Sequence, residues 1–448
     1  MKAKRVSCQT LGCKTNHYET DAIRMQFLAA GYEWVPFSEP ADVYLVNTCT
    51  VTAEADRKSR QMLRRARKHN PDALVVAIGC QVEIGDAANW ADLTINNRQK
   101  GDVCRIVSTH LSTGEDRSVD QMVKDADPDH AVYNELGPVM DQTETRALVK
   151  IEDGCNQFCS YCAIPFARGR VRSRSRDEII RETTALAEHG FQEIVLTGIH
   201  ICSFGSDLGQ APHALSELAL DLSAIPGIAR IRLGSLEPGY ITPEFVRLAV
   251  QNKSLCPHFH LSLQSGSDDI LEKMNRSYRT DVFRTTVQML RSNFDDPAIT
   301  TDVIVGFPGE TDEHFRESLS FCREMAFSRM HVFRYSERRG TAAARMKEQV
   351  PSTIRAARCQ EMMALADELA ALYQQRQIGR ILDVIVEQSL EDGRLEGYSA
   401  NYLPVRFDSP VPLVKGDRTT VRILNRTAEF LHGTQTGPVF HAMIGTSS

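Results

Sequence analysis

The feature that most constrains this chain is a run of three cysteines in the spacing C-x3-C-x2-C, at Cys155, Cys159 and Cys162. They follow a short apolar stretch, residues 147–151, that has the composition of a buried β-strand. Three thiolates can hold three irons of a cubic 4Fe–4S cluster and leave the fourth iron open to a ligand that is not protein. A fully ligated cluster mainly moves electrons, whereas an open iron can bind and activate a small molecule. The motif therefore predicts a catalytic iron–sulfur site.

Two simpler interpretations of this motif are a zinc knuckle and three buried thiols. Zinc usually takes four nitrogen or sulfur ligands, and no fourth ligand lies nearby in the sequence. The chain has twelve cysteines, which in an intracellular protein favours metal or redox use over a disulfide framework.

Length and composition set the wider limits. The chain has 448 residues, of which 42% are hydrophobic and 25% charged, so about three globular domains are expected. It contains no apolar run of about 18 residues and no hydrophobic stretch after its basic start, and we therefore expect a cytoplasmic protein without a membrane segment. The net charge of −6 does not by itself suggest a nucleic-acid partner, but the charge is unevenly distributed.

Residues 1–105 alternate strand-like and helical segments. Residues 6–10, 43–46 and 74–78 resemble strands, with amphipathic segments between them, so an open parallel sheet with helices on both faces is expected. Each of these strands leads into a cysteine, namely Cys13, Cys49 and Cys80. Ligands collect at the carboxyl ends of strands in such sheets, and we therefore predict a second three-thiolate cluster there.

Residues 106–145 are polar and rich in turn formers, which indicates a linker. Residues 146–350 then repeat strand and helix six times, with strands expected at 147–151, 193–197, 228–234, 259–263, 299–305 and 330–335. Six such units predict a partial (βα)6 barrel whose active site lies at the carboxyl ends of its strands. The three-cysteine motif follows the first of these strands.

The C-terminal part completes an α/β protein of three domains. Residues 351–377 have a helical pattern that stops before Gly379, a residue typical of helix C-termini. Residues 378–442 contain short alternating strands with turn signals, which predict a small all-β barrel.

The whole chain resembles the methylthiotransferase branch of the radical S-adenosylmethionine (SAM) enzymes, in which an N-terminal three-cysteine domain and a radical SAM core precede an RNA-binding TRAM domain. The resemblance rests on T-L-G-C-K-T-N at 10–16, N-T-C-T-V-T at 47–52, the cysteine motif with Tyr161, L-Q-S-G-S at 263–267 and D-V-I-V-G-F-P-G-E-T at 302–311.

Two strings bear on the substrate. C-A-I-P-F-A-R-G-R-V-R-S at 162–173 and L-T-G-I-H-I-C-S-F-G at 196–205 are similar to the members that act on N6-threonylcarbamoyladenosine in tRNA. The alternatives within the family are isopentenyladenosine in tRNA and an aspartate of a ribosomal protein. Cys202 departs from the small residue expected in the second string, and the sequence suggests no function for it.

The resemblance implies two 4Fe–4S clusters. Cys155, Cys159 and Cys162 would hold the one whose open iron takes the amino and carboxylate groups of SAM. Cys13, Cys49 and Cys80 would hold an auxiliary cluster that presents the sulfur. Radical chemistry would then place a methylthio group on C2 of the adenine at tRNA position 37, next to the anticodon, so both open irons must face one cavity.

Further residues are candidates for SAM contacts. They are Thr197, Gly198 and His200 after the second barrel strand, Ser235 and Glu237 after the third, Gln264 after the fourth, and Arg276 and Gly306. Polar residues at the carboxyl ends of barrel strands are often functional. The alternatives are a plain turn with a solvent-facing His200, a surface ion pair for Arg276 and a tight turn around Gly306.

RNA affinity is expected from contacts between cationic side chains and phosphates. Arg168, Arg170, Arg172 and Arg174 form an acid-free run beside the cluster motif and are the predicted RNA contacts. Residues 57–68 carry seven Lys and Arg without an acid, which indicates either RNA contact or a solvated helix face.

The leading hypothesis is thus a methylthiotransferase that uses SAM, two clusters, a tRNA substrate and a reductant protein of unknown identity, as a monomer or weak dimer. A competing hypothesis is a non-catalytic electron-transfer protein, which predicts no SAM cleavage. Another is an RNA-binding module with structural zinc.

Overall fold

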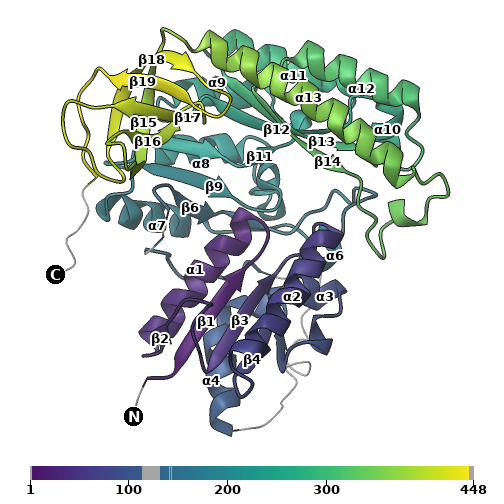
Figure 1. Cartoon of the computed structure of the whole chain (residues 1–448), viewed down its shortest axis with the longest axis vertical. Coiled ribbons are helices and arrows are strands. Elements are labelled where there is room, and N and C mark those ends of the chain that lie inside the picture. Colours follow the sequence, from purple (N-terminus) through teal and green to yellow (C-terminus); the bar gives the residue numbers. More distant parts are fainter. Residues whose placement is uncertain (1–2, 114–131, 141, 143, 443–448) are drawn as a thin grey trace.

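The computed structural model describes residues 3–113, 132–140, 142 and 144–442, so residues 114–131 of the linker expected at 106–145 lie outside the described residues. Residues 106–113 are not a linker, because they belong to a helix, Val103–Thr113, that buries Ile106 and Val107. An N-terminal open sheet, a central half-barrel and a small closed barrel follow one another along the chain (Figure 1). Among the described residues, no helix is both long and apolar enough to span a membrane.

The N-terminal sheet is entirely parallel and has the order β2-β1-β3-β4-β5. Its two central strands are buried along their whole length, which explains their continuous apolar sequences. One side packs against α1 and α4 and the other against α2. The elements are β1 (Arg5–Thr10), α1 (Lys14–Ala29), β2 (Glu33–Trp34), β3 (Val43–Thr48), α2 (Ala53–His69), β4 (Leu74–Gly79), α3 (Cys80–Ile84), β5 (Leu93–Ile95) and α4 (Val103–Thr113).

Helix α2 shows why basic residues gather at one of its ends. Thr52 caps its N-terminus by accepting a hydrogen bond from the backbone N–H of Ala55, and Glu54 and Asp56 lie in the first turn. Its last turn contains Arg67, Lys68 and His69. Both ends complement the helix dipole, so part of the basic run is accounted for by helix stability.

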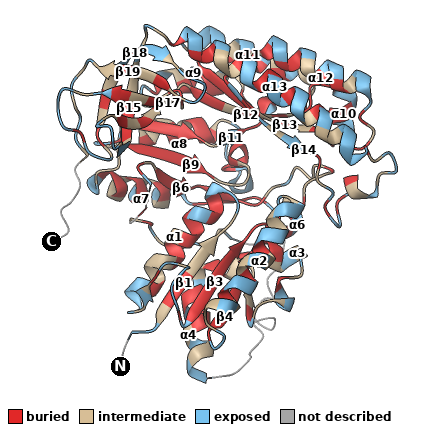
Figure 2. Ribbon diagram, in the orientation of Figure 1, coloured by how far each residue is buried: buried red, intermediate tan, exposed pale blue. Residues whose placement is uncertain are grey.

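The central domain is an incomplete barrel of parallel strands in two sheets, β10-β9-β6 and β11-β12-β13-β14. Helices cover its outer side, and the buried residues concentrate in the strands (Figure 2). The fold thereby confirms the expected six strand–helix units. The strands are β6 (Ala147–Lys150), β9 (Glu193–Thr197), β10 (Arg230–Leu233), β11 (Ser235–Leu236), β12 (His258–Gln264), β13 (Ala298–Val305) and β14 (Arg329–Arg334), and the helices are α7 (Arg176–Glu188), α8 (Ala214–Leu222), α9 (Pro243–Gln251), α10 (Asp268–Lys273), α11 (Thr280–Asn293) and α12 (Asp312–Met325).

The C-terminal barrel closes over the amino ends of the half-barrel strands. Helix α13 (Ser352–Arg376) packs on β14 and leads into the C-terminal barrel. Arg230 Nε lies 2.8 Å from Asp383 Oδ2, and Arg232 donates to the carbonyl of Ala400 at 3.0 Å, while both arginines pair with the buried Glu193. These bonds fix the two domains together. The strand order is β15 (Ile381–Ser389), β16 (Leu395–Ser399), β17 (Pro404–Asp408), β19 (Leu431–Gln435) and β18 (Arg418–Arg426).

Candidate active site

The three-cysteine motif forms a loop held by a short hairpin. Strand β7 (Glu152–Asp153) pairs with β8 (Arg172–Ser173), and the loop between them contains the motif and α6 (Ile164–Arg168). Gly154 is required where the hairpin strands converge, because a Cβ there would lie 2.0 Å from the carbonyl oxygen of Arg170, and its φ is +86°. The hairpin thus places the loop just beyond the carboxyl end of β6.

Each thiol of the loop accepts a hydrogen bond from an N–H group. The backbone N–H of Gln157 donates to Cys155 Sγ at 3.4 Å, that of Ile164 donates to Cys162 Sγ at 3.4 Å, and Arg276 Nη1 donates to Cys159 Sγ at 3.1 Å. Donors aimed at sulfur stabilise a thiolate and tune an attached cluster. The three half-buried thiols therefore fit a cluster-binding role.

Glu152 supports the turn that follows β9. Its Oε2 accepts the backbone N–H groups of Ile199 (2.9 Å) and His200 (2.8 Å). A Cβ on Gly198 would lie 2.7 Å from the same oxygen, so only glycine leaves room for this carboxyl group. Glu152 is fully buried, and burial raises the pKa of its carboxyl group to about 8.

We expect Glu152 to make stability depend on pH. In an unfolded chain its pKa would be about 4.3, so between that value and about 8 only the folded state holds the proton. The free energy of unfolding should therefore fall as pH rises through this window and level off above it. The measurement is the free energy of unfolding, from urea denaturation of the protein without clusters between pH 6 and 8. It should decline with pH more steeply in the wild type than in Glu152→Gln, by up to about 1.4 kcal/mol per pH unit. Parallel declines would contradict the assignment.

His200, Glu237 and Arg276 meet behind the cluster loop. His200 Nε2 lies 2.9 Å from Glu237 Oε2, and Arg276 Nη2 lies 3.5 Å from the same oxygen. Ser277 donates to the other oxygen of Glu237 at 2.7 Å. The alternatives of a solvent-facing histidine and a surface ion pair do not apply, because these side chains form one largely buried network.

The remaining candidates for SAM contacts are spread around the carboxyl end of the barrel. Thr197 is buried at the end of β9, and Ser235 is exposed in β11. Gln264 has a left-handed φ of 66° at a register shift in β12. Residues other than glycine rarely adopt this backbone conformation, and where they do it is often at a functional site. The space over Gly306 is filled by Arg355 of α13, so no Cβ fits there.

The second set of cysteines gathers at the carboxyl edge of the N-terminal sheet. Cys13 precedes α1, Cys49 follows β3, and Cys80 begins α3 after β4. A Cβ on Gly12 would lie 2.8 Å from Cys49 Sγ, so this glycine permits the close approach of the loops. Burial raises the pKa of Cys49 to about 11, and the neighbouring Cys80 and Cys13 contribute to the rise.

The two sets of cysteines lie next to one another. Helix α3, which begins at Cys80, packs against α6, which follows Cys162. Cys80 is also close enough to contribute to the raised pKa of Cys162. Arg168 at the end of α6 connects the sites, since its Nε lies 3.4 Å from Cys80 Sγ while its Nη1 lies 3.0 Å from Asp153 Oδ1 beside the cluster loop.

Three of the four arginines expected to contact RNA lie in the interior. Arg168, Arg172 and Arg174 are at most 6% exposed, and they pair with buried carboxylates such as Asp153 and Glu182. Their guanidinium groups are occupied by the fold and are not presented to a phosphate. Only Arg170 of this run is exposed.

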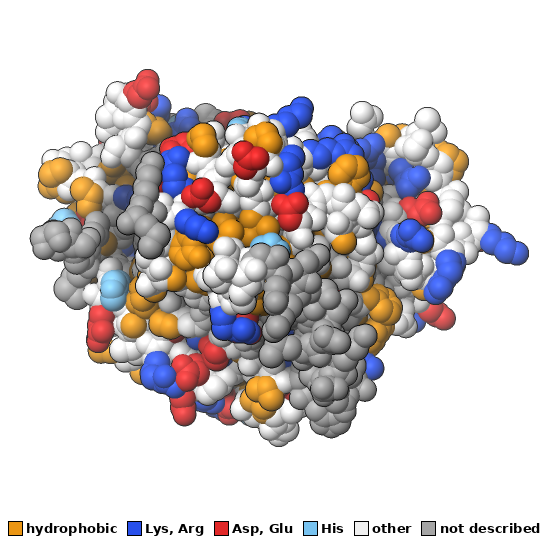
Figure 3. Space-filling model, turned by 90° about the horizontal axis from the view of Figure 1, so that it is seen from below, with side chains coloured by type: hydrophobic (Ala, Val, Ile, Leu, Met, Phe, Trp, Pro, Cys, Tyr) orange, Lys and Arg blue, Asp and Glu red, His pale blue; other side chains and the backbone are white. Residues whose placement is uncertain are grey.

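The basic run on α2 is partly neutralised by acids. Arg57 pairs with Glu54, Arg60 with Asp86 and Arg67 with Asp92. Seen from below, Lys and Arg side chains on the molecule are intermixed with Asp and Glu (Figure 3). This arrangement supports a solvated helix face for much of the run.

Two cavities adjoin the cysteine loops. One, of about 230 Å³, is lined by Tyr161, Gln264 and Asp302 of the central domain and by Val51 and Thr52 of the N-terminal domain. It therefore lies where the two domains meet at the carboxyl end of the barrel.

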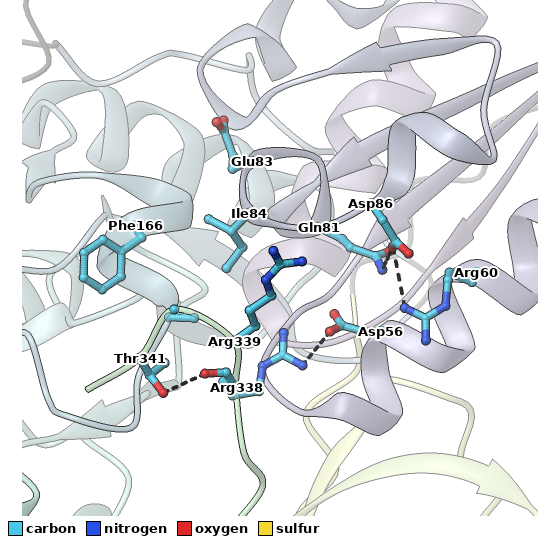
Figure 4. Close-up of a pocket in the computed structure, with 13 residues that line it drawn as sticks. Asp56, Arg60, Gln81, Glu83, Ile84, Asp86, Phe166, Arg338, Arg339 and Thr341 are labelled. Atoms are coloured by element: carbon cyan, nitrogen blue, oxygen red, sulfur yellow. Dashed lines mark hydrogen bonds and ion pairs between the residues drawn. The ribbon is translucent and has the colours of Figure 1, made fainter. Parts of the chain in front are cut away.

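The other cavity, of about 660 Å³, lies between α2, α3, the residues after Cys162 and the loop after β14. Phe166 and Arg339 line it, and Arg339 has no polar partner among the described residues (Figure 4). In contrast, Arg338 beside it is paired with Asp56.

The donor set can be tested against the metals that it would hold. No three His, Cys, Asp or Glu side chains among the described residues converge on a position for a single ion. A zinc site needs that convergence, with sulfur about 2.3 Å from one ion. A cubic cluster binds each cysteine through a different iron and does not need it. The two sets of thiols, each near polar N–H donors, therefore fit clusters better than zinc.

Several residues of the site carried no recognisable sequence signal. Glu152 has no motif of its own. Glu19, buried on α1, pairs with Lys100, Lys150 and Arg168, which are all distant from it in sequence. Cys202 is buried in the core of the central domain, where its Sγ accepts the backbone N–H of Glu237 at 3.3 Å. This packing accounts for the residue that departs from the expected pattern.

A parallel half-barrel with a three-cysteine loop beyond its first strand defines the class of radical SAM enzymes, and the model of the Radical SAM superfamily matches residues 149–322. A second model, of the uncharacterized family UPF0004, matches residues 5–93. Among solved structures, the radical SAM methyltransferase TsrM from Kitasatospora setae has the same fold, with a TM-score of 0.55, 15% identity and coverage of 74% of this chain and 73% of that one.

Relatives with higher identity narrow the class. Threonylcarbamoyladenosine tRNA methylthiotransferase MtaB of Bacillus subtilis is 38% identical over 94% of this chain and 93% of its own. The protein of the same name from Thermotoga maritima is 36% identical over 90% and 91%. A tRNA-2-methylthio-N6-dimethylallyladenosine synthase of Geobacillus thermodenitrificans is 33% identical over 94% and 82%. The chain therefore belongs to the radical SAM tRNA methylthiotransferases, within the MtaB-like subfamily.

Proposed function

We propose that this enzyme converts N6-threonylcarbamoyladenosine at position 37 of tRNA, next to the anticodon, into its 2-methylthio derivative. The observation that carries this proposal is the adjacency of the two three-cysteine sites, which allows one reaction cavity to receive both a SAM-derived radical and a sulfur donor. Similarity to the MtaB relatives supports the choice of substrate, since it exceeds the similarity to the dimethylallyladenosine enzyme.

In this proposal Cys155, Cys159 and Cys162 would hold a 4Fe–4S cluster that binds SAM, and Cys13, Cys49 and Cys80 would hold the auxiliary cluster. When bound, these groups supply reductive SAM cleavage and a sulfur for transfer. The residues of the protein would orient these groups. Two hydrogen-bonded groups lie beside the cluster loop. One is the Gly198 turn, held by Glu152, and the other is the network of His200, Glu237 and Arg276.

Arg276 is suited to an anionic group of SAM. Its Nη1 donates to Cys159 Sγ, whereas its Nη2 is buried without a hydrogen bond among the described residues. Nη2 lies 3.5 Å from Glu237 Oε2 without making a hydrogen bond. A buried N–H that lacks a hydrogen bond is costly, and a carboxylate bound at the cluster would supply one. Thr197, Ser235, Gln264 and Gly306 remain proposed neighbours of the cofactor at the same end of the barrel.

For RNA we propose contacts from exposed cations around the domain junction. Arg170 beside the cluster loop and Arg339 in the larger cavity are exposed, and such cations attract phosphates. The enzyme would act in the cytoplasm as a monomer or weak dimer, with electrons from a reductant protein.

Deletion of the gene tests the substrate. We expect tRNA from the deletion strain to lose 2-methylthio-N6-threonylcarbamoyladenosine and accumulate its unmethylthiolated precursor, with recovery on complementation. Mass spectrometry of digested tRNA measures both nucleosides. Loss of the isopentenyladenosine derivative instead, or of a modified ribosomal protein, would refute the proposed substrate.

A further inference from the structure

The inner side of the half-barrel, its lumen, carries polar side chains on several strands. Along β14, Met330 packs into the core under α13, so Arg329 and His331 face the lumen by strand alternation. Both are exposed. On β12, His258 and His260 likewise alternate with the core residue Phe259. Arg329 and His331 are therefore accessible from the inner side of the half-barrel.

Lys14 enters this lumen from the N-terminal domain. Its Nζ lies 5.7 Å from the ring centre of Tyr402, which belongs to the C-terminal barrel. Lys14 is exposed, and no carboxylate of the described chain lies within ion-pair distance of its Nζ. Arg329 is also exposed and without a polar partner there. Two cations of the lumen thus lack a counter-charge.

The other cations at this end of the barrel are compensated. Arg146 pairs with Glu387 at 2.8 Å, and Arg232 pairs with Glu193 at 2.7 Å. Both guanidinium groups also lie over the Tyr402 ring, at 5.1 and 4.5 Å. Lys14 and Arg329 are therefore the cations here without an ion pair among the described residues, and the lumen carboxylate Asp302 lies 3.4 Å from His260.

The pKa of the Tyr402 phenol is shifted by these cations. Burial raises the pKa of its phenol, but Lys14, Arg146 and Arg232 together lower it by more, so the pKa lies below the ordinary value for tyrosine. A partly buried phenol with a lowered pKa is consistent with the positive charges around its ring.

Lys14 and Arg329 border the same floor of the lumen. The ring of Tyr402 lies 5.0 Å from that of His258, and His258 Nε2 lies 3.2 Å from Thr300 Oγ1. Thr300 is paired in register with Arg329. Burial lowers the pKa of His331, the Asp302 carboxylate raises it, and Arg329 and Lys14 lower it, so both cations lie near this histidine. A single anionic group in this part of the lumen would be attracted by both.

We propose that Lys14 and Arg329 bind the carboxylate of the threonylcarbamoyl group and so select this substrate over isopentenyladenosine. The inference rests on the proposed function. An isopentenyl group is apolar and would cover the two cations without offering them a hydrogen bond, which is unfavourable. The anion is the carboxylate of the modified base and not a backbone phosphate, because phosphates are joined to the RNA polymer. An N6 substituent of a single base can extend into the lumen.

The test compares binding of anticodon stem-loop RNAs, so it needs no turnover. Four RNAs would carry N6-threonylcarbamoyladenosine, its neutral carboxamide analogue, isopentenyladenosine or plain adenosine at position 37. Wild-type protein should bind the carboxylate RNA about tenfold to a hundredfold more tightly than the carboxamide RNA. Lys14→Gln and Arg329→Gln should lose most of this ratio and keep their affinity for plain adenosine. Lys253→Gln, which removes an exposed charge elsewhere, should keep the ratio.

Two outcomes separate this inference from the proposed function. If wild-type protein converts threonylcarbamoyladenosine but binds carboxylate and carboxamide RNAs equally, or if both Gln variants retain the preference, the inference is refuted and the proposed function stands. If wild-type protein converts only isopentenyladenosine, both are refuted. The carboxamide comparison uses unaltered protein, so it does not depend on how well a variant folds.

Discussion

Replacing Cys155, Cys159 and Cys162 together with alanine is expected to abolish SAM cleavage and methylthiolation. These thiols are the proposed ligands of the only cluster that would bind SAM, and each accepts an N–H donor in the folded loop. Release of 5′-deoxyadenosine, measured by chromatography after anaerobic reconstitution, should fall below detection. Iron content should fall to about half if each set of thiols holds one four-iron cluster.

Cys359→Ala is the matched control, because this thiol lies on α13 and, within the part of the chain that the structure describes, its one hydrogen bond is to Met363. It should retain full iron content and full activity. SAM cleavage that persists in the triple variant would refute the assignment of the cluster, and loss of all iron would show that the two sites do not assemble independently.

Replacing Arg168 with methionine is expected to destabilise the fold strongly. Arg168 is buried and pairs with Glu19 and Asp153 (2.8 and 3.0 Å). Although burial raises the pKa of Glu19, Arg168, Lys100 and Lys150 lower it well below its ordinary value, so Glu19 remains charged. Removing one member of such a network leaves buried charge uncompensated and costs about 3–5 kcal/mol. Urea denaturation measures the loss.

Two further variants make this prediction specific. Arg168→Lys keeps a positive charge beside Glu19 and Asp153 and should therefore lose less stability than Arg168→Met. Arg181→Met breaks only a surface pair with Glu178 and should cost less than about 1 kcal/mol. An Arg168→Met effect as small as that of Arg181→Met would contradict the structural role of the network.

The sequence predicts most of the architecture because the signals are local. Strands such as Val43–Thr48 and Leu74–Gly79 are largely apolar, and each is followed by a cysteine, so their ends and their common edge could be predicted. The six barrel strands were likewise predicted from apolar runs between helices. The short strands Glu33–Trp34 and Ser235–Leu236 were missed, because two residues carry no periodicity.

The environment of the arginines could not be predicted in this way. Arg168, in a run that alternates with small residues, resembles an exposed RNA-binding segment. Its partner Glu19 lies 149 positions away in the sequence, and only the packing of α1 against β6 brings the two together. Ion pairs between domains depend on tertiary contacts, which a pattern along one segment does not encode.

The same limit applies to the lumen. Lys14, Arg329 and Tyr402 come from three domains. Lys14 belongs to the motif T-L-G-C-K-T-N, which indicates a cluster ligand at Cys13 and not an anion site, and Arg329 and Tyr402 belong to no motif that the sequence analysis identified. Their common location follows from the way in which the N-terminal sheet and the C-terminal barrel close the two open parts of the half-barrel.

The most direct test is an anaerobic reaction of the reconstituted enzyme with SAM, a reductant and tRNA that carries N6-threonylcarbamoyladenosine, followed by mass spectrometry of the digested nucleosides. The proposed function predicts the 2-methylthio derivative of that nucleoside, formed together with 5′-deoxyadenosine. SAM cleavage without this product, in reactions where isopentenylated tRNA is methylthiolated instead, would contradict it.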